Sequence, residues 1–159
     1  MTLKKHLAKK YIPSSKKWKL VLKGVGKLYR AIYDELKEAD EKVSTKVLAN
    51  AAYKVGLDFG ETLREEFHLG NTIKDIAFAM DIEHKVFGIK AKVAEKNQRK
   101  IIYHCHECAW EKYFEPKLCI AIGQAEKGIA QALNPQAKYH VLETRTMGRD
   151  RCTIEIEIF

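Results

Sequence analysis

Residues 138–159 have the sequence KYHVLETRTMGRDRCTIEIEIF, and this stretch decides the fold class. Its second half alternates strictly, and one face is formed by Cys152, Ile154, Ile156 and Ile158. Such alternation predicts a half-buried β-strand. Because the polar turn at 147–150 precedes this strand, residues 138–146 and 151–159 are expected to pair as an antiparallel hairpin.

A second hairpin is expected upstream. Residues 89–93 alternate between apolar and lysine side chains, residues 95–99 are polar, and residues 101–105 would supply the returning strand. Before Gly88 the apolar period is helical instead. The period of the apolar residues therefore changes from helical to alternating near Gly88.

Three helices are predicted before the first hairpin. The first is long, and its apolar stripe comprises Trp18, Val21, Val25, Leu28, Ile32, Leu36 and Val43. Ser44 is expected to cap the second helix, whose apolar face comprises Val47, Leu48, Ala51, Val55, Phe59, Leu63 and Phe67. Gly56 and Gly60 would let a neighbouring backbone approach this helix, and Gly70 suits the position past its end. Thr72 and Asp75 form a capping-box pattern for the third helix.

Between the hairpins, a short aromatic helix is expected near Trp110, followed by one helix from Pro116 to Leu133. Asn134-Pro135 ends it. The predicted fold is α+β: N-terminal helices and a C-terminal helix pack on an antiparallel sheet of about four strands, built from two hairpins.

The composition indicates one globular unit. The chain has 159 residues, of which 46% are hydrophobic and 31% charged, with a net charge of +8. Much of the positive charge lies near the start, so we divide the chain into a basic arm, residues 1–14, and a single α+β ligand-binding-type domain, residues 15–159. The arm is consistent with nucleic-acid binding, but no nucleic-acid-binding motif accompanies it. We therefore do not expect a nucleic-acid partner.

The sequence also predicts a cytoplasmic location. No apolar run has the roughly 20 residues needed to cross a bilayer. Lysines interrupt residues 1–10, where a signal peptide would carry its apolar region. The four cysteines are then expected to be thiols or ligands, not disulfides.

All four cysteines lie between His104 and Cys152. Cys105 and Cys108 have the spacing of half a zinc site or of a redox pair. No second Cys-x-x-Cys follows, and the pair does not occur in a βαβ unit. Buried structural thiols are the third interpretation, and the spacing alone does not separate the three.

Several ionisable residues accompany the cysteines. His104 and His106 would share one side of their strand, and His106 with Glu107 is a candidate general base. His84 lies on the apolar stripe of the third helix, where a hydrogen-bonded core histidine is expected. Glu143 faces the core if Val141 does, whereas the opposite register leaves it in water; the sequence leaves both registers open.

From Cys105 to its end the chain resembles the L-2-amino-thiazoline-4-carboxylic acid hydrolase family and the related 4-vinyl-reductase-type small-molecule-binding domains. The matching elements are HECAW at 106–110, Leu118-Cys119, Gly123 and ETRTMGRDRC at 143–152. The resemblance implies helices on an antiparallel sheet, a ligand pocket between them, and a homodimer. The leading hypothesis is thus binding of a small hydrophobic, aromatic or thiazoline-like molecule, with Cys105, Trp110 and His84 as ligand-binding residues.

The hydrolase relatives give the alternative, an enzyme that opens a thiazoline ring. In that case His106 and Glu107 would be catalytic. The sensory relatives imply a zinc ion, which Cys119, Glu143 and Cys152 would bind. Thr146 replaces a cysteine expected there, so we add Cys108 as the remaining metal ligand.

Overall fold

The computed structural model describes residues 14–159. Helices α2 (Ser14–Ala39), α3 (Glu41–Phe67) and α4 (Ile73–Phe87) come first. The hairpin β1 (Lys90–Lys96) and β2 (Lys100–Glu107) follows, then the short helix η1 (Glu111–Tyr113), α5 (Pro116–Ile122) and α6 (Gln124–Leu133). Strand β3 (Lys138–Glu143), η2 (Arg145–Met147) and strand β4 (Cys152–Glu157) close the chain. The predicted basic arm lies outside the described residues except for Ser14, where α2 begins.

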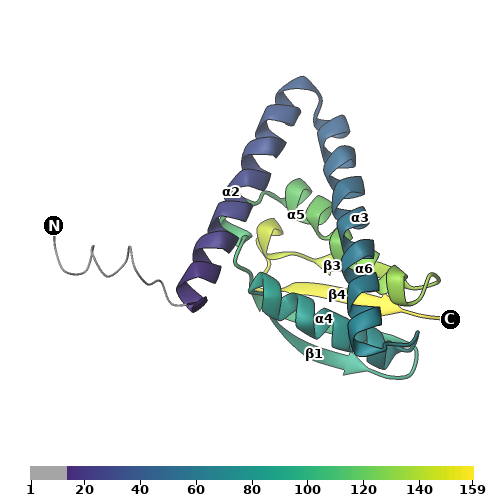
Figure 1. Cartoon of the computed structure of the whole chain (residues 1–159). Coiled ribbons are helices and arrows are strands. Elements are labelled where there is room, and N and C mark those ends of the chain that lie inside the picture. Colours follow the sequence, from purple (N-terminus) through teal and green to yellow (C-terminus); the bar gives the residue numbers. More distant parts are fainter. Residues whose placement is uncertain (1–13) are drawn as a thin grey trace, which may run out of the picture.

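The four strands form one antiparallel sheet in the order β1-β2-β4-β3. The predicted α+β fold with two hairpins is confirmed. Helices α3, α4 and α6 lie over one face of the sheet, and α2 and α3 form a tall helical hairpin that rises from it (Figure 1). The inner face carries Ile101, Tyr103, Ile154 and Ile156, which are buried against these helices.

The start of α4 has the predicted cap. Thr72 accepts a hydrogen bond from the Asp75 backbone N–H, and the Asp75 carboxylate accepts one from the Thr72 N–H. The start of α3 differs from the prediction, because Asp40 is the N-cap and not Ser44. His68, not Gly70, takes the left-handed conformation at the end of α3, with φ 52°.

The apolar stripe predicted for α2 faces the protein only in part: Val25 packs against the core, and Trp18 donates to the carbonyl of Val86. Val21, Leu28 and Ile32 are 48, 60 and 38% exposed, whereas Leu22, Gly26 and Tyr33 are buried. The side of α2 that packs lies about a quarter turn from the stripe. On α3, too, the valines of the predicted face are exposed, and the buried residues are Ser44, Leu48, Ala52, Gly56, Gly60 and Leu63.

Small residues explain why α3 buries this side, because they let the backbones of α3 and α6 come into contact. A Cβ atom added at Gly56 would lie 2.0 Å from the carbonyl oxygen of Ala125, and one at Gly128 would lie 2.3 Å from that of Tyr53. The expected close approach at Gly56 and Gly60 is confirmed. The single helix predicted from Pro116 to Leu133 is instead two helices, α5 and α6, separated at Gly123.

Candidate functional site

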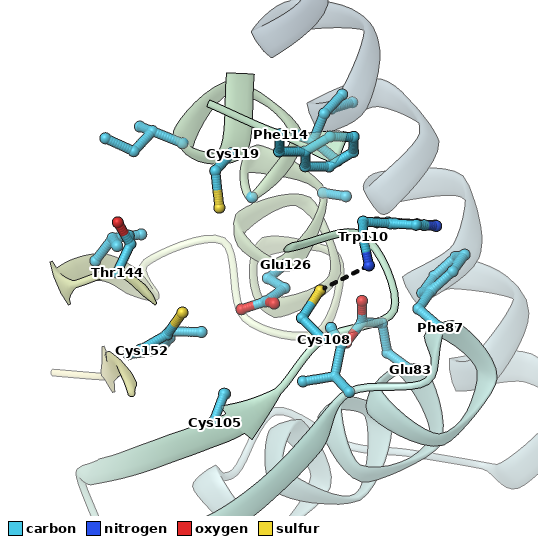
Figure 2. A pocket seen from close by; sticks show the side chains of 18 of the residues that line it. Glu83, Phe87, Cys105, Cys108, Trp110, Phe114, Cys119, Glu126, Thr144 and Cys152 are labelled. Atoms are coloured by element: carbon cyan, nitrogen blue, oxygen red, sulfur yellow. Dashed lines mark hydrogen bonds between the residues drawn. The ribbon is translucent and has the colours of Figure 1, made fainter. Parts of the chain in front are cut away.

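A cavity of about 120 Å³ lies between the helices and the inner face of the sheet. It extends from the crevice between α2 and α3, where Tyr29 and Val55 line it, down to strands β2, β3 and β4. Most of its wall is apolar. Figure 2 shows many of its lining side chains, among them Phe87, Trp110, Phe114 and the four cysteines.

Each cysteine reaches the cavity from a different part of the chain. Cys105 is on β2, Cys108 follows that strand, Cys119 is on α5, and Cys152 begins β4. Cys105 and Cys152 are register partners on neighbouring strands. Figure 2 shows the sulfur atoms of Cys108, Cys119 and Cys152 directed into the space between these elements. All four are free thiols.

The sulfur atoms have protein partners of their own. The backbone N–H of Trp110 donates to the Cys108 Sγ at 3.5 Å, and that of Arg145 donates to the Cys152 Sγ at 3.4 Å. Burial nevertheless raises the pKa of every thiol, to about 11 for Cys108 and to about 12 for Cys119. At neutral pH the cluster is therefore uncharged, and it does not have the thiolate character of a redox site.

These raised pKa values predict slow alkylation of the folded protein. At pH 8 an ordinary thiol with a pKa of about 8.5 is roughly one quarter thiolate, whereas a pKa of about 11 leaves roughly one thousandth. Iodoacetamide should therefore label Cys108 about 200-fold more slowly than in the same protein unfolded in urea. The rate should rise tenfold per pH unit. Equal rates in the two states, measured by mass spectrometry, would contradict the burial of this thiol.

Aromatic side chains form the wall near α2. Trp110 packs against Phe87 and Phe114, with ring centroids 5.3 and 5.7 Å apart, and against the edge of Tyr29. Its indole Nε1 donates to the carbonyl of Leu22 at 2.9 Å. This bond fixes the position of the indole ring relative to α2.

Two buried carboxyl groups form the polar part of the cavity wall. Glu83 on α4 is 4% exposed and Glu126 on α6 is 7% exposed. Burial raises both pKa values: that of Glu126 to about 7, and that of Glu83 well above its usual range, where the nearby Glu126 adds to the effect. Tyr139 on β3 donates to the Glu126 Oε2 at 3.0 Å. Glu83 has no hydrogen-bond partner for its Oε2 among residues 14–159.

Of the three residues predicted to bind a ligand, Cys105 and Trp110 line the cavity and His84 does not. His84 is buried behind the wall beside Glu83, and its ring packs edge-on against Tyr103. The expectation of a hydrogen-bonded core histidine is wrong in one respect, because neither ring nitrogen has a partner in the described part of the chain. Burial lowers the pKa of His84 to about 4.

The candidate catalytic pair lies elsewhere. His106 and Glu107 are exposed at the end of β2, and Glu107 forms an ion pair with Lys90 at 2.8 Å. Since Cys105 points inward, period two turns His104 and His106 to the outer face of the sheet, and their rings are 6.5 Å apart. They share a side as predicted, but neither His106 nor Glu107 lines the cavity.

Glu143 follows neither predicted register. Tyr139 and Val141 face inward, but a β-bulge between Val141 and Glu143 shifts the pairing, so that Glu143 lies opposite Thr153. The hydroxyl of Thr153 donates to its carboxylate at 2.9 Å, and the side chain is 39% exposed. Thr144 occupies the inward position instead and is buried.

This arrangement does not suit the zinc site that the family resemblance implies. The Glu143 carboxylate is bound to Thr153 and does not line the cavity with the cysteines. Among residues 14–159, the one group of three or more ligand atoms within 4.8 Å of one another is Glu83, His84 and Glu126. Cys108, Cys119, Cys152 and Glu143 are thus not assembled around a common ion.

Glu83 and Glu126 are site residues that the sequence patterns did not predict. The signal was their position on apolar helix stripes: Glu83 follows Ile76 and Met80 at helical spacing, and Glu126 lies between Ile122 and Ile129. A carboxyl group at such a position is either neutralised or bound.

Comparisons of the sequence with protein-family models and with curated proteins gave no match. The fold has relatives among solved structures. One is trafficking protein particle complex subunit 3 from Naegleria fowleri, covalently bound to palmitic acid, with a TM-score of 0.71 and 16% identity over 89% of this chain and 96% of that one. Another is the phenol-responsive sensory domain of the transcription activator PoxR, with phenol, with a TM-score of 0.63 and 12% identity over 86 and 73%.

At these identities the likeness shows the fold alone. It places the chain among α+β proteins in which helices cover one face of an antiparallel sheet. The resemblance to the thiazoline hydrolases and 4-vinyl-reductase-type domains stays a prediction. Within residues 14–159, no helix combines the length and the apolarity that crossing a membrane requires.

Proposed function

We propose that this protein binds a small, single-ring molecule in the cavity. The observation that carries the proposal is the cavity itself: about 120 Å³, mostly apolar, with two carboxyl groups at one side. An engineered apolar cavity of roughly 150 Å³ binds benzene. A phenol or a thiazoline ring therefore matches the available volume, and its polar atom would meet Glu83 or Glu126.

The two structural relatives support different ligand sizes. The PoxR domain has phenol, and the trafficking subunit has palmitic acid attached covalently. A long acyl chain needs far more volume than this cavity offers, and the raised thiol pKa values disfavour acylation of the cysteines. Cavity size therefore favours the phenol-like class.

A matched pair of substitutions on α3 tests the proposal. Ala52 lines the cavity, whereas Ala51 is exposed. Ala52→Phe should fill the space and weaken binding at least about 100-fold, because the ring would occupy the volume of the ligand. Ala51→Phe should leave affinity unchanged. Calorimetric titration with phenol, 2-aminothiazoline-4-carboxylate and a long-chain fatty acid would measure these affinities.

Tight binding of the fatty acid alone would contradict the size argument. Equal affinity of the two variants for a ring compound would place the ligand outside the cavity. Thermal unfolding of each variant without ligand verifies that Ala52→Phe remains folded, so that a lost affinity is not a lost fold.

The homodimer implied by the family resemblance stays part of this proposal. The exposed apolar row on α2 and α3 is the surface that supports it, because exposed apolar side chains that recur on one face of a helix are typical of an interface. The row comprises Trp18, Val21, Leu28 and Ile32 of α2, and Val43, Val47 and Val55 of α3.

A further inference from the structure

Three ionisable side chains meet at the cavity wall: Glu83 and Glu126 line the cavity, and His84 is buried behind them. Glu83 and His84 are neighbours on α4, and Glu126 extends toward them from α6. Their exposed fractions are 4, 3 and 7%. Neither His84 nitrogen has a hydrogen-bond partner among the described residues, and neither does the Glu83 Oε2. Buried polar atoms without hydrogen-bond partners destabilise the folded protein. We therefore expect the cluster to bind a further group.

The spacing of these atoms identifies the kind of group. The Nε2 atom of His84 is 3.6 Å from the Glu83 Oε2 and 3.9 Å from the Glu126 Oε1. Direct hydrogen bonds would need roughly 2.7–3.2 Å. Atoms that bind one metal ion at about 2.1 Å stand roughly 3.0–3.4 Å apart at tetrahedral or octahedral angles. The cluster is too wide for hydrogen bonds, and the two distances from the His84 Nε2 would shorten by roughly 0.2–0.9 Å around an ion.

We propose that Glu83, His84 and Glu126 bind one divalent transition-metal ion, such as zinc, at the wall of the cavity. An imidazole nitrogen with carboxylate oxygens is a donor set that such ions accept. Two carboxylates cancel the charge of the ion, so that the buried assembly is neutral, as an apolar surrounding demands.

A hydrogen bond from a neighbouring side chain orients one of the two carboxylates for metal binding. The hydroxyl of Tyr139 donates to the Glu126 Oε2, which leaves the Oε1 directed at His84. Glu83 and Glu126 both line the cavity, so the open side of the ion faces it. A phenolate or carboxylate on a bound molecule would complete the coordination. Metal binding itself rests on the three side chains and not on the proposed ligand, so the two proposals fail separately.

The test is titration of the full chain, freed of metal with a chelator, with zinc alone. We expect one ion per chain, and at least about 100-fold weaker binding for Glu83→Gln, His84→Ala and Glu126→Gln. Glu143→Gln is the matched carboxylate control and should bind as the wild type does. A triple variant, Cys108→Ser, Cys119→Ser and Cys152→Ser, should also retain the ion.

Cobalt substitution separates the two donor sets by spectroscopy. A cobalt ion held by oxygen and nitrogen gives no sulfur-to-metal charge-transfer absorption, whereas bound thiolates give an intense band. We expect no such band. The proposal is overturned if the wild type binds no zinc, if the glutamate and histidine variants bind as tightly as the wild type, or if the thiolate band appears. Circular dichroism of each variant verifies that the fold is intact.

Discussion

Gly128→Ala should lower the free energy of unfolding by about 3 kcal/mol or more, a large loss for a single added methyl group. The new Cβ would lie 2.3 Å from the carbonyl oxygen of Tyr53 and 2.7 Å from the Leu57 nitrogen. These are backbone atoms of α3, which cannot move aside as a side chain can. Helices α3 and α6 would therefore have to separate along their whole contact.

Gly56→Ala, on α3, should lower the free energy of unfolding by a similar amount, since its Cβ would lie 2.0 Å from the Ala125 carbonyl oxygen on α6. Thermal unfolding would show the loss as a fall of roughly 6–12 °C in the melting temperature. Because Ala125 lines the cavity, the separation should also open the ligand site.

Gly24→Ala is the matched control. Gly24 lies inside α2, and nothing is within 4 Å of its added Cβ. Alanine there should stabilise the protein by about 0.5–1 kcal/mol, because it favours the helix more than glycine does. If all three alanine variants behaved alike, the close contact between α3 and α6 would be refuted.

These glycines also show where sequence patterns succeed and where they fail. The β4 alternation from Cys152 to Ile156 and the Thr72–Asp75 cap were predicted correctly, because each depends on residues a few positions apart. The buried side of α3 was predicted only in part: Leu48 and Leu63 are buried as expected, whereas the valines of the predicted face are exposed and Gly56 contacts α6 instead. A prediction from the spacing of hydrophobic residues does not count glycine among the residues that make contacts.

Part of the candidate site, too, could be predicted from the sequence, and part could not. Strand register, which alternation predicts, places Cys105 and Cys152 at the cavity. Cys108 and Cys119 are not on strands, and the packing of the segment after β2 and of α5 places them there. The position of Glu143 depends on one extra residue in β3, and a bulge leaves no trace in the alternation of so short a strand. The Glu83–His84–Glu126 cluster depends on how α4 and α6 face each other, which only the packed structure shows.

Glu83→Met should stabilise the metal-free protein at pH 8, by roughly 1–3 kcal/mol. Methionine has a similar shape and no charge, and the Glu83 Oε2 has no hydrogen bond to lose among the described residues. Burial raises the pKa of Glu83 in the folded state, so the native protein binds more protons than the unfolded chain. The contribution of Glu83 to the stability of the wild type therefore falls as the pH rises above about 4.3, the pKa of an unfolded glutamate.

The gain from Glu83→Met should accordingly be small near pH 4 and grow toward pH 8. Urea unfolding with a chelator present measures it, and Glu107→Met on the exposed face is the control, with a change within about 0.5 kcal/mol. Added zinc should reverse the order, since it stabilises only the chain that binds it. If Glu83→Met were less stable than the wild type in the absence of metal, Glu83 would already have a stabilising partner. In that case the carboxyl group would be structural, and its burial would give no reason to expect an ion.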